Sequence, residues 1–234
     1  GEGARMSDND NNNEGGLELL FNDLLIAGGA PTEMTEAILK QYQLDQQHFI
    51  LEPGCGSGKL ATNLAVTRGC HATLLDNDDG ALQLATRIKC GLEGIRNLSI
   101  PVTIRKADIR KIPFMDDTFH LVLSEGVVEH FKPPITIMRE MLRVSKDALV
   151  VMTPNGRNEK QVRIAKQQVE AYKDKPDFWA SYEKPMVEED LRAILEELQL
   201  KEIFVTLLWS DKEVAETKDD NRIIFGFGRK NRQP

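Results

Sequence analysis

The sequence predicts an α/β protein with a doubly wound, mostly parallel sheet of seven strands and helices on both faces. Two observations lead to this fold class. Short apolar runs alternate with helical patterns between residues 49 and 152, and two further β-rich runs, 202–209 and 223–227, follow near the end of the chain. Strands separated by helical patterns of this length form parallel β-α units whose helices cover the sheet.

The single elements follow from apolar periodicity and from turn residues. Helical patterns separate the strands of the alternating part, and two of these helices are expected to end near Gly69 and Gly91. A later helix is predicted over 186–198, with Pro185 just before its start. The alternating part itself contains predicted strands at 49–51, 71–75, 102–104, 119–123 and 148–152.

Composition is that of an ordinary globular protein. Of the 234 residues, 41% are hydrophobic and 29% are charged, and the net charge is −7. An acidic chain is a poor partner for nucleic acid, because phosphates require a basic surface. No apolar run is long enough for a membrane span, no signal-peptide pattern appears, and the three cysteines match no metal or redox motif. We therefore expect a cytoplasmic protein that binds no metal, membrane or nucleic acid.

One domain is expected over residues 17–234. The polar, asparagine-rich stretch at 1–16 has almost nothing to bury, so we expect a disordered tail there. Two amphipathic helices, at 17–27 and 32–42, precede the alternating part. An edge strand in the final forty residues could form a contact between two subunits, so a homodimer is possible. The domain divides into N-terminal cap helices at 17–47, a central half at 48–156, an insertion at 157–184, and a C-terminal helix and strands at 185–234.

The stretch FILEPGCGSGKLATNL ends a predicted strand and opens a helix, with Gly54, Gly56 and Gly58 at alternate positions. Glycine lets bare backbone approach a ligand. In open parallel sheets, ligands bind beyond the carboxyl ends of the strands, where an acidic residue about 20 positions later accepts hydrogen bonds from a ribose. Asp76 ends the second strand, 20 residues after Gly56. A dinucleotide fingerprint would need glycine where the chain has Lys59, so a dehydrogenase is disfavoured.

A series of motifs makes the reading more specific. LEPGCGSG, the acidic end of ATLLD, KADIRKIPFMDDTFHLVLSEGVVEHF and VVMTPNG follow in order over roughly 49–156. Together they resemble class I S-adenosylmethionine-dependent methyltransferases, particularly the branch that acts on small molecules. The resemblance implies a Rossmann-like methyltransferase fold, an enzyme, and S-adenosylmethionine as the cofactor. It continues more thinly into YEKPMVEEDLRAILEELQLKEI.

The resemblance assigns the first two strand ends to the cofactor. The three glycines of the loop, Gly54, Gly56 and Gly58, are assigned to close passage of the backbone along it. Glu52 matches an acidic position near its methionine end, and Asp76 matches the carboxylate that binds its ribose. Taken alone, Asp76 could equally be a helix-start carboxylate.

The next two strand ends complete the cofactor assignment. Asn77 falls beside the adenine, Asp108 matches the acceptor of the adenine amino group, and Ile109 would offer its backbone amide. The backbone of Ser124 and Glu125 matches the segment that meets the cofactor's amino group. Asp108 alone could equally cap a short turn at 109–111, but carboxylates at successive strand ends together with the glycines favour binding.

The acceptor is expected on the same edge of the sheet. Methyl transfer is an in-line displacement that depends mainly on alignment, and it needs a base only when the acceptor carries a proton to be lost. His130, in VVEHF, is the candidate catalytic base, with an orienting role as the alternative. Glu129, Asn155, Trp179 and Tyr182 are candidate substrate residues, although the two aromatic side chains could equally anchor the insertion.

The expected function is transfer of a methyl group from S-adenosylmethionine to a small-molecule acceptor. SEGVV follows the fourth strand, in place of the proline-rich tetrapeptide used for amino-group methylation on adenine or glutamine. One alternative is a methyltransferase of the same fold that acts on protein or RNA. Another is a catalytically silent, methyltransferase-like partner subunit, which the intact glycine loop and the two carboxylates disfavour.

Overall fold

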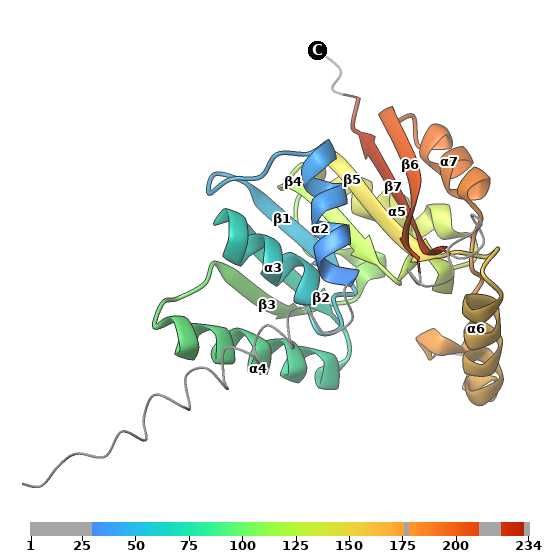
Figure 1. Cartoon of the computed structure of the whole chain (residues 1–234), viewed down its shortest axis with the longest axis horizontal. Helices are drawn as coiled ribbons and strands as arrows, with labels where there is room; N and C mark the ends of the chain where they lie inside the picture. The colour runs from blue at the N-terminus through green and yellow to red at the C-terminus, as the bar shows by residue number, and fades with distance from the viewer. Residues whose placement is uncertain (1–29, 176–177, 211–220, 232–234) are drawn as a thin grey trace, which may run out of the picture.

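The predicted fold class is confirmed by a seven-stranded sheet in the order β3-β2-β1-β4-β5-β7-β6. The computed structural model describes residues 30–175, 178–210 and 221–231 (Figure 1), so the expected tail at 1–16 and helix at 17–27 lie outside the described residues. The first five strands are parallel, whereas β7 runs antiparallel to β5 and to β6. The strands are β1 Phe49–Pro53, β2 His71–Asp76, β3 Val102–Lys106, β4 Phe119–Glu125, β5 Ser145–Pro154, β6 Lys201–Ser210 and β7 Asn221–Arg229.

Helices cover both faces of the sheet, as predicted. Apolar residues of α2 (Ala30–Gln41), α3 (Lys59–Arg68) and α4 (Asp79–Arg96) are buried in the core on one face. Those of α5 (Pro134–Val144) and α7 (Glu188–Glu197) are buried in the core on the other. The expected cap helix at 32–42 is thus α2, and it packs with Met34 and Ile38 into the first core.

The segment predicted as an insertion, residues 157–184, stands apart from both layers. It contains α6 (Glu159–Tyr172) and the short 3-10 helix η3 (Trp179–Ser181), and Figure 1 shows α6 beyond the edge of the sheet, on the side where β5 ends. Ala165 is the buried residue of α6. Helix α6 therefore lies beside the carboxyl ends of the strands.

Strand order places the switch point between β1 and β4. The chain moves outward from β1 through β2 to β3 and then returns to β4 on the other side of β1. At such a point the two connections leave the sheet in opposite directions, and ligands bind beyond the carboxyl ends of the strands there. The glycine loop after β1 lies at this point.

Two predicted helix ends are wrong. Helix α4 does not end near Gly91 but continues to Arg96, because Leu92 is fully buried and Asn97, with φ of 49°, forms the cap. Helix α7 begins at Glu188 instead of at residue 186, because Met186 is extended: it forms a bridge with Asn155, and its carbonyl accepts a hydrogen bond from Gly156 N at 2.6 Å. In the described part of the chain no helix is long and apolar enough to cross a membrane.

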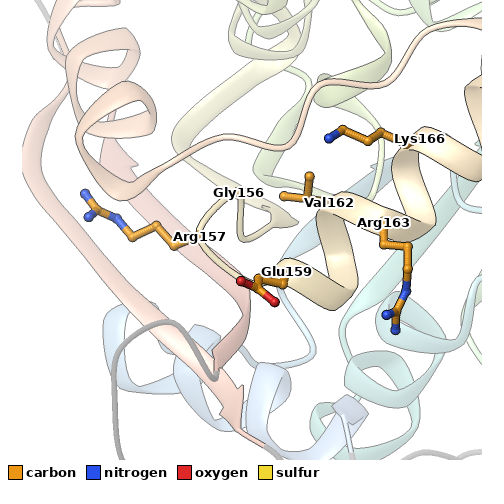
Figure 2. Close-up of a pocket in the computed structure, with 6 residues that line it drawn as sticks. All are labelled: Gly156, Arg157, Glu159, Val162, Arg163 and Lys166. Atoms are coloured by element: carbon orange, nitrogen blue, oxygen red, sulfur yellow. The ribbon is translucent and has the colours of Figure 1, made fainter.

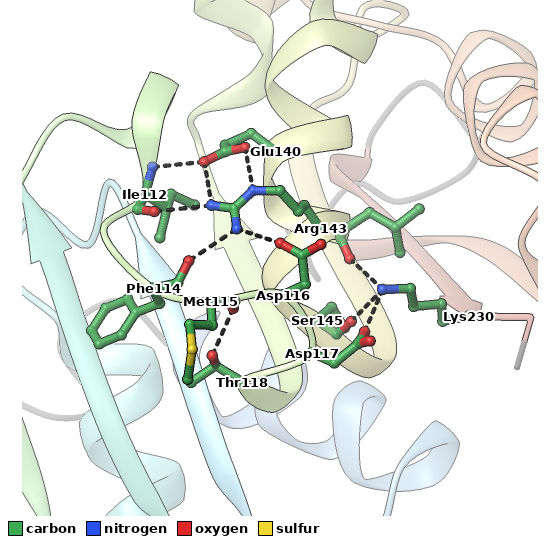
Figure 3. Close-up of polar contacts among 11 residues, drawn as sticks. Ile112, Phe114, Met115, Asp116, Asp117, Thr118, Glu140, Arg143, Ser145 and Lys230 are labelled. Atoms are coloured by element: carbon green, nitrogen blue, oxygen red, sulfur yellow. Dashed lines mark hydrogen bonds and ion pairs between the residues drawn. The ribbon is translucent and has the colours of Figure 1, made fainter.

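Arg143 fixes the connection between β3 and β4 onto α5 (Figure 3). Its guanidinium donates to both carboxylate oxygens of Glu140 and to Asp116, and it also donates to the carbonyls of Ile112 and Phe114 at 2.9 Å. Glu140 in turn accepts from Ile112 N at 2.7 Å. A planar fork that serves two carboxylates and two carbonyls at once holds the loop in one conformation.

Candidate functional site

The loop between β1 and α3 turns on three glycines with positive φ. A Cβ on Gly54 would lie 2.7 Å from Val127, and one on Gly58 would lie 2.4 Å from Leu74. The protein's own packing therefore requires glycine at these two positions. Gly56 differs: its φ is +52°, and a Cβ there would meet nothing within 4 Å. Of the three, Gly56 is the one whose open side leaves room for a ligand.

Asp76 ties this loop to the end of β2. Its Oδ2 accepts a hydrogen bond from Gly56 N at 2.9 Å, and its Oδ1 accepts from Asp78 N at 3.0 Å. The side chain is half-buried. The carboxylate thus lies directly beside the open glycine, and its predicted role in binding a ribose stays a prediction.

Glu52 lies beneath the loop and is buried. Its Oε2 accepts from Ala61 N, in the first turn of α3, at 3.0 Å. Burial raises the pKa of Glu52 to about 8, and the nearby carboxyls of Glu125 and Asp76 add to the shift, whereas the bond from Ala61 opposes it. A buried acid beside two other acids favours a positively charged group at this point.

The end of β3 carries a carboxylate with local partners. Asp108 caps the 3-10 helix η1 (Ile109–Lys111): it accepts from Arg110 N at 2.9 Å and pairs with the Arg110 guanidinium at 2.7 Å. These bonds hold the pKa of Asp108 below its usual range. The capping role seen from the sequence is therefore present. Ile109 is half-buried against the core, and Asn77, after β2, is exposed.

Ser124 and Glu125 end β4 next to the glycine loop. The Ser124 side chain is buried, and its hydroxyl has no hydrogen-bond partner among the described residues. Glu125 reaches solvent, yet the surrounding protein removes enough water to raise the pKa of its carboxyl. Gly126 N donates to the carbonyl of Met152 at 3.0 Å, which fixes this turn to the end of β5.

His130 lies in the 3-10 helix η2 (Val128–His130), just past β4. Its Nδ1 lies 2.8 Å from the carbonyl oxygen of Tyr182. A carbonyl only accepts, so Nδ1 carries the proton and Nε2 keeps its lone pair. Burial lowers the pKa of His130, which favours this neutral form near pH 7. The ring is thus oriented by the insertion and holds a basic nitrogen.

Glu129, beside it, is 2% exposed. Burial raises its pKa to about 8, and the carboxyls of Glu183 and Glu125 contribute in the same direction, while the Thr153 hydroxyl opposes them. Glu129 Oε2 makes no regular hydrogen bond within the described residues. Sequence analysis missed Glu183, since no pattern marks it; only the path of the insertion brings it here.

Aromatic side chains link the insertion to His130. The Trp179 indole packs edge-on against the imidazole with ring centroids 4.8 Å apart, and Phe178 bridges from Trp179 to Tyr172 on α6. Trp179 remains 53% exposed. Trp179 can therefore both anchor the segment to η2 and line the site. Tyr182 contributes its backbone carbonyl.

Asn155 does not suit the predicted contact with an acceptor. It is fully buried; its Nδ2 donates to the carbonyl of Asn221 at 2.8 Å, and its Oδ1 accepts from Arg157 N at 3.0 Å. Both ends of the amide thus hold the chain where β5 leaves the sheet. We correct its assignment from substrate binding to a structural role.

A cavity of about 450 Å³ lies at the start of α6 (Figure 2). In Figure 2, Val162 and Lys166 lie on the side of α6 next to Gly156, whereas Arg157 points away and pairs with Glu189 at 2.7 Å. The remaining lining residues are Glu159 and Arg163. None of the strand-end carboxylates lines this cavity, so we place the reaction at the glycine loop.

Comparison with known proteins bears on the central half of the chain. A family profile described as "Methyltransferase domain" matches residues 51–151. Methyltransferase GfsG of Streptomyces halstedii is 29% identical over 128 residues, which are 55% of this chain and 42% of the relative. Norajmaline N-methyltransferase of Rauvolfia serpentina is 28% identical over 115 residues, 47% of this chain and 37% of the relative. The matched part thus spans less than half the length of these curated relatives.

Solved structures extend the likeness to most of the chain. A SAM-dependent methyltransferase from Thermotoga maritima, described as a possible histamine N-methyltransferase, has a TM-score of 0.61 at 16% identity and covers 92% of this chain and 95% of its own. Magnesium protoporphyrin IX methyltransferase from Synechocystis, with bound SAH, has a TM-score of 0.57 at 12% identity and covers 99% and 90%. At these identities the likeness supports the fold.

Proposed function

We propose that this protein transfers a methyl group from S-adenosylmethionine to a small-molecule acceptor, because residues 51–151 match the family profile described as "Methyltransferase domain". The sequence relative named for norajmaline favours an acceptor of this kind. The cytoplasmic location and a homodimer stay predictions.

One observation carries the proposal. Gly56 presents bare backbone to open space, and the Asp76 carboxylate is bonded to its N–H at 2.9 Å. A ligand lying along Gly56 therefore has an acidic group within reach at the switch point of the sheet, as a ribose requires. The residues present fit an adenosyl cofactor.

The other strand ends would hold the remaining parts of the cofactor. Glu52 and Glu125 would lie at the cationic methionine end, whose positive charge would favour the ionised form of Glu52 over its neutral form, and Ile109 would offer an apolar side chain and a backbone amide to the adenine. The Asp108 carboxylate is paired with the Arg110 guanidinium. A hydrogen bond from an adenine amino group to Asp108 would therefore have to form beside this ion pair or replace it. When bound, S-adenosylmethionine supplies a methyl group on a positively charged sulfur.

His130 serves as the base in this proposal. Tyr182 holds its Nδ1 proton, so Nε2 is the atom that accepts a proton from the acceptor. Trp179 packs against the ring and limits its rotation. The insertion therefore contributes to the chemistry by fixing the tautomer and the orientation of one imidazole.

Calorimetric titration with S-adenosylmethionine, followed by transfer of labelled methyl groups to a panel of small molecules, proteins and RNA, tests the proposal. We expect micromolar binding and transfer to one class of small molecule. Binding without transfer across the panel would favour the silent partner subunit, and transfer to protein or RNA alone would favour the first alternative. No binding of the cofactor would refute the assignment of the site.

A further inference from the structure

Three carboxyl groups gather around η2. Glu125 and Glu183 both lie close enough to Glu129 to raise its pKa. No cationic group among the described residues contributes to the pKa shift of any of the three. Lys184, next to Glu183 in sequence, is exposed. Ionised carboxylates without a counter-ion leave negative potential at this place, and a cation bound there would favour the ionised form of Glu129 over its neutral form.

Backbone contacts make this gathering a fixed feature. Lys184 N donates to the carbonyl of Glu129 at 3.0 Å, and His130 donates to the carbonyl of Tyr182 at 2.8 Å. The two bonds hold residues 182–184 along η2. Glu183 is therefore positioned by the main chain beside the reaction site.

Buried polar atoms at the same place have no regular hydrogen-bond partner among the described residues. They are Glu129 Oε2 and Thr153 Oγ1, on side chains that are 2% and 0% exposed. The Thr153 hydroxyl lies beside the Glu129 carboxyl and lowers its pKa, but neither buried atom has a partner at regular hydrogen-bond geometry. Buried polar atoms without partners carry a desolvation cost, which a ligand with N–H donors would offset.

Trp179 adds an aromatic surface. Its indole packs against the neutral imidazole of His130 and is 53% exposed. Cations bind favourably over the face of an indole, which is the strongest of the aromatic side chains in this respect. Uncompensated acids, buried acceptor atoms and an exposed indole all suit the same ligand.

We propose that the acceptor is an amine which reaches the site as an ammonium cation and is held by Glu129 and Glu183 against the indole of Trp179. This inference rests on the proposed methyl transfer. The ammonium gives one proton to His130 Nε2, and the nitrogen lone pair so freed bonds to the methyl carbon as the carbon–sulfur bond breaks. The products are a methylated amine and S-adenosylhomocysteine.

The test measures binding to the full chain saturated with S-adenosylhomocysteine. Three probes of one shape are compared by calorimetry: 2-phenylethylammonium, 2-phenylethanol and phenylacetate. We expect the ammonium to bind at least about tenfold more tightly than the alcohol, and the carboxylate to bind most weakly. Glu183→Gln should reduce the preference for the ammonium about fivefold or more, with unchanged affinity for S-adenosylhomocysteine.

Glu196→Gln is the matched control, because it removes the same charge from an exposed position on α7; it should leave the preference unchanged. Equal affinity for ammonium and alcohol, including no binding of either, overturns the amine assignment, as does an equal effect of the two substitutions. Failure of S-adenosylhomocysteine itself to bind would instead count against the proposed function, so the two failures are distinguishable.

Discussion

The backbone N–H of Gly56 donates to Asp76 Oδ2 at 2.9 Å and thereby joins the ends of β1 and β2 at the proposed cofactor site. Asp76→Ala removes both this tie and the proposed ribose acceptor. We expect the affinity for S-adenosylmethionine to fall about ten- to a hundredfold, since a hydrogen bond to a charged group contributes about 1.5–3 kcal/mol. Calorimetric titration measures the change, and Asp190→Ala, at an exposed position on α7, should leave the affinity unchanged.

Gly56→Val tests the open side of the loop. A side chain at φ +52° is strained, and it would fill the space in which nothing now lies within 4 Å. Cofactor binding should be nearly abolished, while the fold loses about 1–2 kcal/mol of stability. The control is Gly91→Ala, inside α4 with equally open surroundings, which should stabilise the helix by about 0.5–1 kcal/mol without affecting binding. Equal cofactor affinity in both variants would contradict the assignment.

His130→Gln tests the proposed base. With Nε2 removed, kcat should fall about a hundredfold or more while cofactor affinity stays constant. In the parent protein burial lowers the pKa of His130, so the acidic limb of the kcat profile should lie below the usual histidine value of about 6.5. A variant that keeps most of kcat and the same pH profile would indicate an orienting role instead.

Stability should depend on pH through Glu129. Burial raises its pKa to about 8 in the folded protein, whereas an unfolded glutamate titrates near 4.5. Between these values the folded state holds a proton that the unfolded state has lost, so the stabilisation is complete below about 4.5 and is lost as the pH rises through about 8. Glu129→Gln, which mimics the neutral acid, should flatten this part of the profile. Urea unfolding between pH 5 and 9 measures the stability of the parent protein and of Glu129→Gln. Parallel pH profiles for the two proteins would contradict this prediction.

Arg143→Lys should destabilise the protein by about 1–3 kcal/mol, because a single ammonium cannot replace a fork that serves two carboxylates and two carbonyls. Arg139→Lys is its counterpart on the same helix. The exposed pair of Arg139 with Glu197 should be worth no more than about 0.5 kcal/mol. Denaturant unfolding compares the two, and equal losses would mean that the network contributes little.

Local pattern determined most of the fold. Alternation of apolar runs with helical patterns is enough to predict parallel strands, and a positive-φ turn after a buried strand requires glycine, so the loop after β1 could be placed from residues alone. The end of α4 could not be predicted in this way. Leu92 is buried only in the folded core, and its burial stabilises the helix beyond Gly91. Periodicity within a segment says nothing about which distant surface will cover it.

The acceptor side was decided by tertiary structure. The letters VVEHF marked His130, but its tautomer depends on the carbonyl of Tyr182, 52 residues later, and Asn155 became structural because β7 and the backbone of Arg157 take up its amide. Glu183 carries no signal of its own. Its importance arises from the path of the insertion, which two main-chain contacts fix along η2. Close-range chemistry between segments far apart in sequence is set by packing, and packing is what a linear pattern leaves unspecified.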